Sequence, residues 1–258
     1  MYQGIYHCGA ISSSEKSIVT VIPCTGCFIL REGIRVDSSS SGDILFTGII
    51  LKMVKVMNTK KEDIDALILR HVEEYGRESM KNFRASHGWD HVQRVYALAC
   101  HIAEKEGVDI FIVKAASILH DIGREAENRA GGTLCHAELG AEMARQFLQT
   151  QGVDNDRTEH IARCILTHRY RGHLRPETVE AMAVHDADKL DSIGAVGIGR
   201  AFLFSGEVGA KLHNPSIDIH ATSAYSEEDT AYREFIHKLQ YVRERMLTGE
   251  GKRLAEGR

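Results

Sequence analysis

Hydrophobic and polar positions follow different patterns in two parts of this chain, and the change falls near residue 57. Before it, short β-prone pieces such as residues 17–22 and 27–30 are separated by serine-rich breaks, notably residues 38–42. After it, apolar residues recur every three to four positions, as they do on one face of a helix. The pattern predicts a mainly helical protein with a short N-terminal segment of different character.

The N-terminal segment, residues 1–56, is predicted to be a poorly structured extension, for which a misassigned translation start is one explanation. A small β appendage is the alternative. Its lone C-x-x-C, Cys24 to Cys27, lacks the four ligands that a zinc site needs, so we interpret it as two incidental cysteines. Asn58 or Thr59 is expected to cap the first helix of the remaining chain.

Residues 57–258 are predicted to form one all-α domain, a helical bundle of about eight helices with short connections. The expected helices run approximately over residues 61–83, 89–106, 109–122, 136–150, 155–169, 176–184, 187–203 and 229–247. The stretch 205–228 contains glycine, proline and several polar residues and is expected to be a long loop. Long loops in compact domains often act as lids.

Composition narrows the classes of function. A chain of 258 residues with 43% hydrophobic content can bury a full core. Its formal net charge of -4 argues against a globally basic protein that binds duplex nucleic acid, while local arginine clusters can still form a phosphate site. The expected partner is a small anion or none.

Neither a membrane nor a secretory route is indicated. The longest apolar stretch, residues 44–51, ends at Lys52, well short of the roughly 20 residues of a membrane-spanning helix. The first residues lack the basic and apolar regions of a secretory signal. The six cysteines are too sparse for a disulfide scaffold, so a reducing cytoplasm is expected.

The main chemical signal is the pair His120 and Asp121, which closes the apolar run at residues 110–119. A buried imidazole and carboxylate are costly unless an ion or hydrogen bonds compensate them, and together they can bind one divalent ion. His91 lies on the apolar face of the predicted helix 89–106, and Asp188 lies in a carboxylate-rich segment read as a helix start. Taken singly, each has a structural explanation as a core histidine or a helix cap.

The order H, HD, D resembles the ligand set of the HD-domain phosphohydrolase superfamily. The resemblance extends to SHGWDHVQRV at residues 86–95, LHDIGR at 119–124 and DADKLDSIGA at 186–195. EFIHKL at 234–239 and TGEGKRLA at 248–255 resemble the C-terminal helices of its small, stand-alone prokaryotic branch, so the similarity covers about residues 60–258. Gly88 replaces a frequent aspartate of that branch, and the last helix is shorter than usual.

The resemblance implies a nucleotide pyrophosphohydrolase that binds a divalent ion through His91, His120, Asp121 and Asp188. Two imidazoles and two carboxylates leave open positions on a six-coordinate ion. Such a set suits Mn²⁺, Fe²⁺, Ni²⁺ or Mg²⁺ better than a closed zinc site. Mn²⁺ is the expected ion, with Mg²⁺, Fe²⁺, Co²⁺ or Ni²⁺ as alternatives, and the reaction is expected to use a metal-activated water.

Several basic side chains near these motifs are candidates for binding substrate phosphate. They are Arg94, Arg124 and Lys189, with Lys238 supported only by the resemblance. Each is equally compatible with a solvated surface charge. Asp191, one turn after Asp188, is expected to orient the attacking water or to serve a helix start, and Asp186 to serve the helix start.

A second histidine set, His136 and His168, lies in CHAELG at residues 135–140 and LTHRYRG at 166–172. These segments resemble the additional histidine motifs of binuclear HD hydrolases, including the HD-GYP phosphodiesterases, but no Gly-Tyr-Pro follows. We therefore favour contact with substrate or with the metal ligands over a second metal.

The leading hypothesis is a phosphohydrolase of nucleotides, acting as a pyrophosphohydrolase or a phosphomonoesterase. The alternatives are a two-metal phosphodiesterase, a metal-bound scaffold without activity, and a di-iron oxygenase. The oligomeric state is left open, with a homodimer as one option. Neither the nucleobase nor the cleaved bond can be predicted from the sequence.

Overall fold

The computed structural model describes residues 22–24, 27–29, 41–130, 133–169, 174–224 and 226–258, with side chains described from residue 60 onward. The chain divides into two compact units, Met1–Glu62 and Asp63–Arg258. In the first unit, β1 (Ile22–Cys24) and β2 (Cys27–Ile29) pair antiparallel, with Cys24 opposite Cys27. The predicted extension over residues 1–56 falls mostly outside the described residues.

The first helix, α1 (Ser41–Ser79), begins well before the predicted cap. Asn58 and Thr59 lie inside this helix, so the cap prediction was wrong. The physical reason is that residues 49–62 contain neither glycine nor proline, and nothing in this stretch stops a helix that has already formed.

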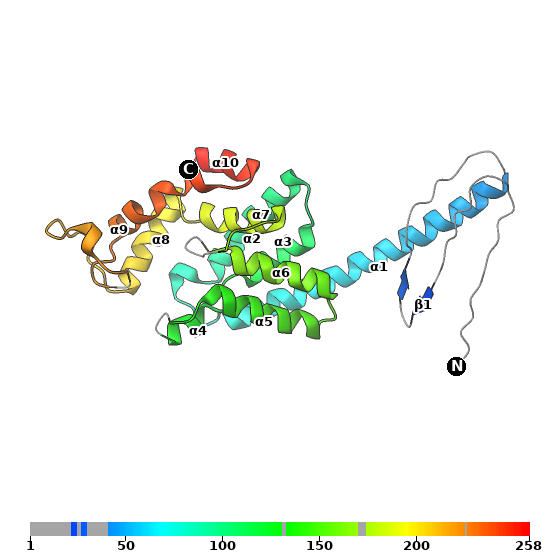
Figure 1. Cartoon of the computed structure of the whole chain (residues 1–258), viewed down its shortest axis with the longest axis horizontal. Helices are drawn as coiled ribbons and strands as arrows, with labels where there is room; N and C mark the ends of the chain where they lie inside the picture. The colour runs from blue at the N-terminus through cyan, green and yellow to red at the C-terminus, as the bar shows by residue number, and fades with distance from the viewer. Residues whose placement is uncertain (1–21, 25–26, 30–40, 131–132, 170–173, 225) are drawn as a thin grey trace. The chain divides into compact units, whose positions relative to one another are not determined.

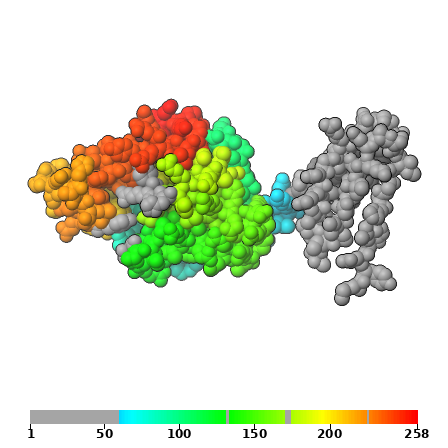
Figure 2. Space-filling model, in the orientation of Figure 1, coloured from blue at the N-terminus to red at the C-terminus, as the bar shows by residue number. Residues whose placement is uncertain are grey.

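All the described secondary-structure elements of the second unit are helices, and the predicted all-α class is confirmed (Figure 1). Its longer helices after α1 are α2 (Trp89–Glu106), α3 (Ile110–Leu119), α5 (His136–Thr150), α6 (Asn155–Thr167), α7 (Val179–Leu190) and α8 (Gly194–Glu207). Shorter ones are α4 (Arg124–Arg129), α9 (Ala231–His237) and α10 (Gly249–Glu256), together with the 3-10 helices η1 (Ala85–His87), η2 (Ile219–Ala221), η3 (Leu239–Tyr241) and η4 (Arg243–Arg245). Figure 2 shows the C-terminal segments, in orange and red, along the upper left edge of this unit.

Helix α3 forms the centre of the core, because α2, α6 and α7 all pack against it. Its side chains are buried almost all round, including Val113, Ala116 and Leu119, which matches the unbroken apolar run in the sequence. Asp109 begins the helix by accepting hydrogen bonds from the backbone N–H groups of Phe111 and Ile112. The chain therefore leaves α3 at the middle of the protein, and His120 and Asp121 follow at once.

Several helix boundaries differ from the prediction near the C-terminal motifs. One helix, α7, spans the predicted break at residues 184–187, because Thr178 caps its start and the chain turns only at Gly194, whose φ is 72°. Asp186 and Asp188 consequently lie in the last turns of α7, and their assignment to a helix start was wrong. The predicted helix 229–247 is divided into α9, η3 and η4, while α4 was not predicted. The region predicted as a loop at 205–228 begins with the end of α8 and contains η2.

None of the helices in the described part of the chain combines the length and apolar character required to span a membrane.

Gly123 allows the close approach of the turn after α3 to the start of α5. A Cβ atom at this position would lie 2.3 Å from the His136 carbonyl oxygen and 2.7 Å from the Gly140 nitrogen, both backbone atoms. We expect Gly123→Ala to lower the free energy of unfolding by about 2 kcal/mol or more, measured by chemical denaturation. Gly199→Ala in α8 is the control, because no atom lies within 4 Å of its added Cβ. It should be neutral or stabilising by up to about 1 kcal/mol, and equal losses in both variants would refute the packing argument.

Candidate metal centre

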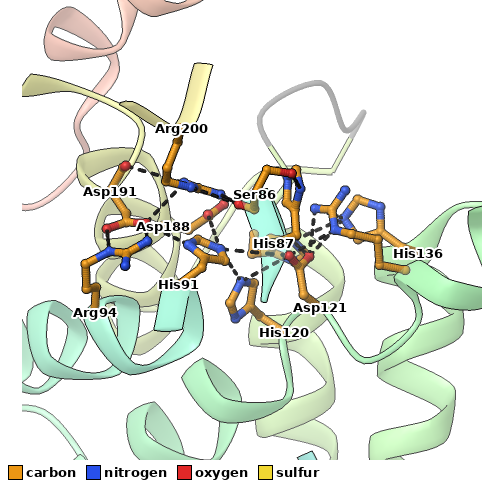
Figure 3. A network of polar contacts seen from close by, with 12 residues as sticks. Ser86, His87, His91, Arg94, His120, Asp121, His136, Asp188, Asp191 and Arg200 are labelled. Atoms are coloured by element: carbon orange, nitrogen blue, oxygen red, sulfur yellow. Dashed lines mark hydrogen bonds and ion pairs between the residues drawn. The ribbon is translucent and has the colours of Figure 1, made fainter. Parts of the chain in front are cut away.

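Five helix termini meet beside α3 and bring the predicted ligands together (Figure 3). His91 comes from the first turn of α2, His120 and Asp121 follow α3, and Asp188 lies in the last turn of α7. The start of α5 adds His136, and the end of α6 adds a further histidine, His168. His91, His120, Asp121, His136 and His168 are buried.

The first group of ligand atoms consists of His91, His120 and Asp188, with one oxygen of Asp121 beside them. The Nε2 atoms of His91 and His120 lie 3.3 Å apart. The Nε2 atom of His91 lies 3.5 Å from Asp188 Oδ1 and 3.9 Å from Asp121 Oδ2, and that of His120 lies 3.6 Å from Asp121 Oδ2. Four potential ligand atoms from three helices thus face one point.

The outer nitrogen of each imidazole in this group is held by a hydrogen bond. His120 Nδ1 donates to the Ser117 carbonyl at 2.8 Å, and His91 Nδ1 donates to Asp191 Oδ2 at 2.7 Å. Since Nδ1 carries the proton, each Nε2 presents its lone pair to the shared point. Hydrogen bonds of this kind orient histidine ligands in metal sites.

The second group consists of the other oxygen of Asp121 with His136 and His168. Asp121 Oδ1 lies 3.5 Å from His136 Nε2 and 3.6 Å from His168 Nε2, and these two nitrogens are 3.4 Å apart. The outer nitrogens are held as in the first group, His136 by Glu127 Oε2 at 2.7 Å and His168 by the Ile165 carbonyl at 2.6 Å. Asp121 therefore faces both groups, one with each oxygen.

The first group fits a divalent cation. Its lone pairs face one another at short range and most of its side chains are buried, which is costly unless a positive charge lies between them. Mixed imidazole and carboxylate ligands are those that Mn²⁺, Fe²⁺ and related ions take in proteins. The structure therefore supplies a donor set suited to a metal.

Charged neighbours keep the carboxylates ionised. Burial alone would raise the pKa of Asp121, but Arg124 and the surrounding histidines hold it well below its usual range. Burial also opposes ionisation of Asp188, whose pKa is nevertheless well lowered by Lys189 and by His120. Burial lowers the pKa of His168 to about 4, so this ring is neutral at neutral pH.

Asp191 belongs to neither of the described ligand groups. Its carboxylate accepts hydrogen bonds from His91 at 2.7 Å and from Arg94 at 2.7 and 3.1 Å, and Arg200 Nη1 lies 3.1 Å from Oδ2. Asp191 follows the end of α7, so it does not serve a helix start, and its described contacts fix His91. Its expected role in orienting a water stays a prediction. Arg94, expected at the phosphate, instead binds Asp191 and Asp90 and is not among the described side chains that line the cavity.

Asp186 has a structural role at a distance in sequence. Its buried carboxylate accepts hydrogen bonds from the backbone N–H groups of Leu247 and Thr248 and from the Thr248 hydroxyl. These contacts tie the start of α10 to α7, the helix that carries Asp188. Asp186 therefore serves the start of a different helix from the one expected.

A cavity of about 770 Å³ opens onto both groups. Five predicted substrate-binding residues line it, namely Arg124, His136, His168, Lys189 and Lys238. Lys189 Nζ lies 2.5 Å from Asp188 Oδ2, and Lys238 Nζ lies 2.8 Å from Glu234 Oε1. Lys211, in the region predicted as a loop, lies near Glu228 and is not among the lining residues described. Val208 and Ala224, from the predicted loop, also line the cavity.

Sequence reasoning did not assign roles to three side chains that shape this region. Arg200 donates to the Ser86 carbonyl at 2.8 and 3.0 Å and contacts Asp191, and so connects α8 to the ligand face. Glu127 fixes His136, and His87 lines the cavity. His87 lies within a quoted motif, whereas Arg200 and Glu127 carry no local signal because their partners are distant or lie on the next helix.

A helical bundle that gathers one histidine, an HD pair and a later aspartate in this way defines an HD-type hydrolase fold. The HD domain family matches residues 88–193. The chain is 36% identical to the protein YpgQ of Bacillus subtilis over 178 residues, which cover 67% of this chain and 78% of YpgQ. The chain therefore belongs to the HD-domain family, and the predicted resemblance is confirmed.

Solved structures agree with this fold. The crystal structure of Bacillus subtilis YpgQ in complex with ADP superposes with a TM-score of 0.57 at 29% identity, covering 74% of this chain and 89% of that one. A predicted HD superfamily hydrolase from an uncultured Thermotogales bacterium gives 0.52 at 27% identity, covering 73% and 83%. Ribonuclease Y of Pseudothermotoga lettingae is 29% identical over 55% of this chain, which spans only 26% of that longer protein.

The buried histidines predict an acid-sensitive metal-free protein. His168 has a pKa of about 4 when folded against 6.5 for the free group, so the unfolded chain takes up the proton first as the pH falls. The contribution of neutral His168 to the free energy of unfolding is complete above pH 6.5 and is lost as the pH falls toward 4. The loss amounts to roughly 2 to 4 kcal/mol. Denaturant titrations of the metal-free protein between pH 4 and 6.5 measure how steeply the free energy of unfolding changes with pH. His168→Gln should flatten this slope and His160→Gln, outside the site, should not; equal slopes for wild type and His168→Gln would contradict the assignment.

Proposed function

We propose that this chain is a metal-dependent phosphohydrolase of nucleotides, acting as a nucleoside triphosphate pyrophosphohydrolase or a phosphomonoesterase. The observation that carries the proposal is the first ligand group, His91, His120, Asp121 and Asp188, at a cavity lined by basic side chains. The neighbouring positive charges suit the equatorial oxygens of a phosphoryl group.

The size of the cavity and one relative support a nucleotide as substrate. A volume of about 770 Å³ falls within the range of small-molecule sites, roughly 300 to 1,000 Å³. YpgQ, 36% identical to this chain, has been crystallised with ADP. The HD-superfamily hydrolase fold alone leaves the substrate open, because function depends on the site more than on the fold.

The chain's own residues have separable tasks in this proposal. A divalent ion held by the first group supplies a water of lowered pKa and polarises a phosphoryl oxygen. Arg124, Lys189 and Lys238 line the cavity and bind the phosphate oxygens. Arg200 also lines it and, through Asp191, connects the cavity wall to His91. We propose Mn²⁺ as the ion, which is compatible with the mixed imidazole and carboxylate set, as Fe²⁺, Co²⁺ and Ni²⁺ also are.

Asp191 is a positioning residue in this proposal. Its contacts with His91, Arg94 and Arg200 support a role in fixing the imidazole, and leave no free oxygen directed at a water in the cavity. The ring it holds is then presented with its Nε2 lone pair toward the ligand point.

A phosphodiesterase is the second candidate function. The observation that favours it is the second group, Asp121 with His136 and His168, which has the composition of a second cation site. The partial similarity to ribonuclease Y also supports a phosphodiesterase, although this chain spans only about a quarter of the length of that protein.

The proposal predicts metal-dependent product release from nucleotides. We expect Mn²⁺ to support release of pyrophosphate or phosphate from a panel of nucleoside mono-, di- and triphosphates, assayed also with Mg²⁺, Co²⁺ and Ni²⁺. The double substitution His120→Ala/Asp121→Ala should lower the rate by a factor of about 10³ or more, because it removes two ligands. His160→Ala is the matched control, since His160 hydrogen-bonds Thr178 away from the ligand groups.

The products distinguish the candidate reactions. Pyrophosphate from triphosphates identifies a pyrophosphohydrolase, and phosphate from monophosphates identifies a phosphomonoesterase. A short RNA and cyclic dinucleotides belong in the same panel, because their cleavage without nucleotide hydrolysis would favour the phosphodiesterase. Wild-type protein that binds Mn²⁺ yet releases nothing from any of these substrates would refute the enzymatic proposal.

Substitution of Asp191 tests the positioning role. Asp191→Asn should weaken Mn²⁺ binding by about 10- to 100-fold and lower kcat while leaving KM for the nucleotide within a few-fold. Asp90→Asn is the control, because Asp90 binds the same Arg94 from an exposed position and contacts His91 only at its backbone N–H, away from the imidazole. An Asp191→Asn enzyme with normal Mn²⁺ affinity would contradict the role.

A further inference from the structure

The two ligand groups are built on the same plan. Each contains one histidine fixed by the backbone carbonyl three residues before it, His120 by Ser117 and His168 by Ile165. Each contains a second histidine fixed by a carboxylate, Asp191 for His91 and Glu127 for His136. Asp121 contributes one oxygen to each group.

The groups differ in the charges that complete them. The first group has a carboxylate of its own, Asp188, in addition to the shared Asp121. The second group has no such carboxylate among the described residues, because Glu127 binds the outer nitrogen of His136 on the far side of the ring. It has a guanidinium instead, that of Arg124.

Arg124 binds two of the atoms that would hold a second ion, Asp121 Oδ1 and His136 Nε2, and it also contacts the Asp121 oxygen of the first group. Its Nη2 donates to Asp121 Oδ1 at 2.9 Å and its Nε donates to Asp121 Oδ2 at 3.0 Å, a two-point contact with one carboxylate. The same Nη2 lies 3.4 Å from His136 Nε2 and donates to it. The side chain is only 18% exposed, so this charge is held within the site.

These contacts leave His136 without a free ligand atom. Because His136 Nδ1 donates to Glu127, its Nε2 has a single lone pair in the ring plane, and Arg124 occupies it. A neutral imidazole cannot offer that lone pair to a metal at the same time. A divalent ion here would also be repelled by the adjacent guanidinium, with no second carboxylate to offset the repulsion.

We propose that Arg124 takes the place of a second metal, so that the protein binds one divalent ion in the first group and the guanidinium is the resident cation of the second. This inference rests on the proposed function for the presence of the first ion. It deepens that function by describing a site with one metal and one arginine, in which phosphate meets the ion on one side of Asp121 and Arg124 on the other.

The number of ions per chain tests the proposal without reference to activity. The full-length protein is stripped with chelator and dialysed to equilibrium against Mn²⁺ at neutral pH, and bound metal is counted by mass spectrometry. Electron paramagnetic resonance of the same samples distinguishes an isolated Mn²⁺ from a spin-coupled pair. We expect one isolated ion in the wild type, and two coupled ions in Arg124→Met, which removes the charge and the donors while keeping an extended side chain.

Three further variants test whether the Arg124 guanidinium is the reason that the wild type binds one ion. Arg169→Met is the matched control, because Arg169 Nη1 lies 3.3 Å from Glu127 and lines the same cavity; it should still bind one ion. Arg124→Lys keeps the charge and should also bind one. Adding His136→Ala to Arg124→Met should return the count from two ions to one.

Two results would overturn the proposal. A count of two ions in the wild-type protein overturns the proposal whatever the variants show. This measurement remains valid even if Arg124→Met does not fold. A folded Arg124→Met protein with one ion or none also overturns it. Failure of the proposed hydrolysis is separate, because an inactive protein with one ion in the wild type and two in Arg124→Met would sustain this inference alone.

Discussion

The burial of the Asp121 carboxylate is the constraint on which this site depends. Asp121 follows α3, the helix at the centre of the core, and is almost completely removed from solvent. A carboxylate in that environment is stable only with positive charge and hydrogen-bond donors around it. Four histidines and Arg124 surround it, and the helices that supply them are those that pack around α3 or adjoin its end. The same helices therefore form the core and supply the groups that stabilise the Asp121 carboxylate.

The ends of two helices orient two of the histidines around Asp121. The last carbonyl groups of a helix have no donor within the helix, and they must find one elsewhere. At the ends of α3 and α6, the Ser117 and Ile165 carbonyls accept hydrogen bonds from the histidines that follow. The same contact satisfies a backbone group and fixes the direction of an imidazole. Histidines placed directly after helices thus need no additional side chain to orient them.

The sequence was sufficient for the features that depend on local pattern. Periodicity predicted the all-α class and placed α2 and α5 at their observed bounds, and the motif order led to the family and to His91, His120 and Asp188, which the structure brings together. It failed where the outcome depends on a distant partner. The contact between Arg94 and Asp191 was not predicted, because nothing near either residue in sequence shows that they bind each other across 97 positions. Arg200 and Asp186 illustrate the same limit, since their partners lie on other helices.

The shared carboxylate has a thermodynamic consequence. Asp121 faces the first group with Oδ2 and the second with Oδ1, and its single negative charge is divided between them. A cation that binds the carboxylate in one group therefore weakens the attraction of Asp121 for a cation in the other group. By linkage, a ligand that pulls Arg124 away from Asp121 must raise the affinity of the first group for its cation, and the cation must raise the affinity for that ligand by the same factor. One carboxylate therefore makes occupancy by cation and by anion mutually dependent.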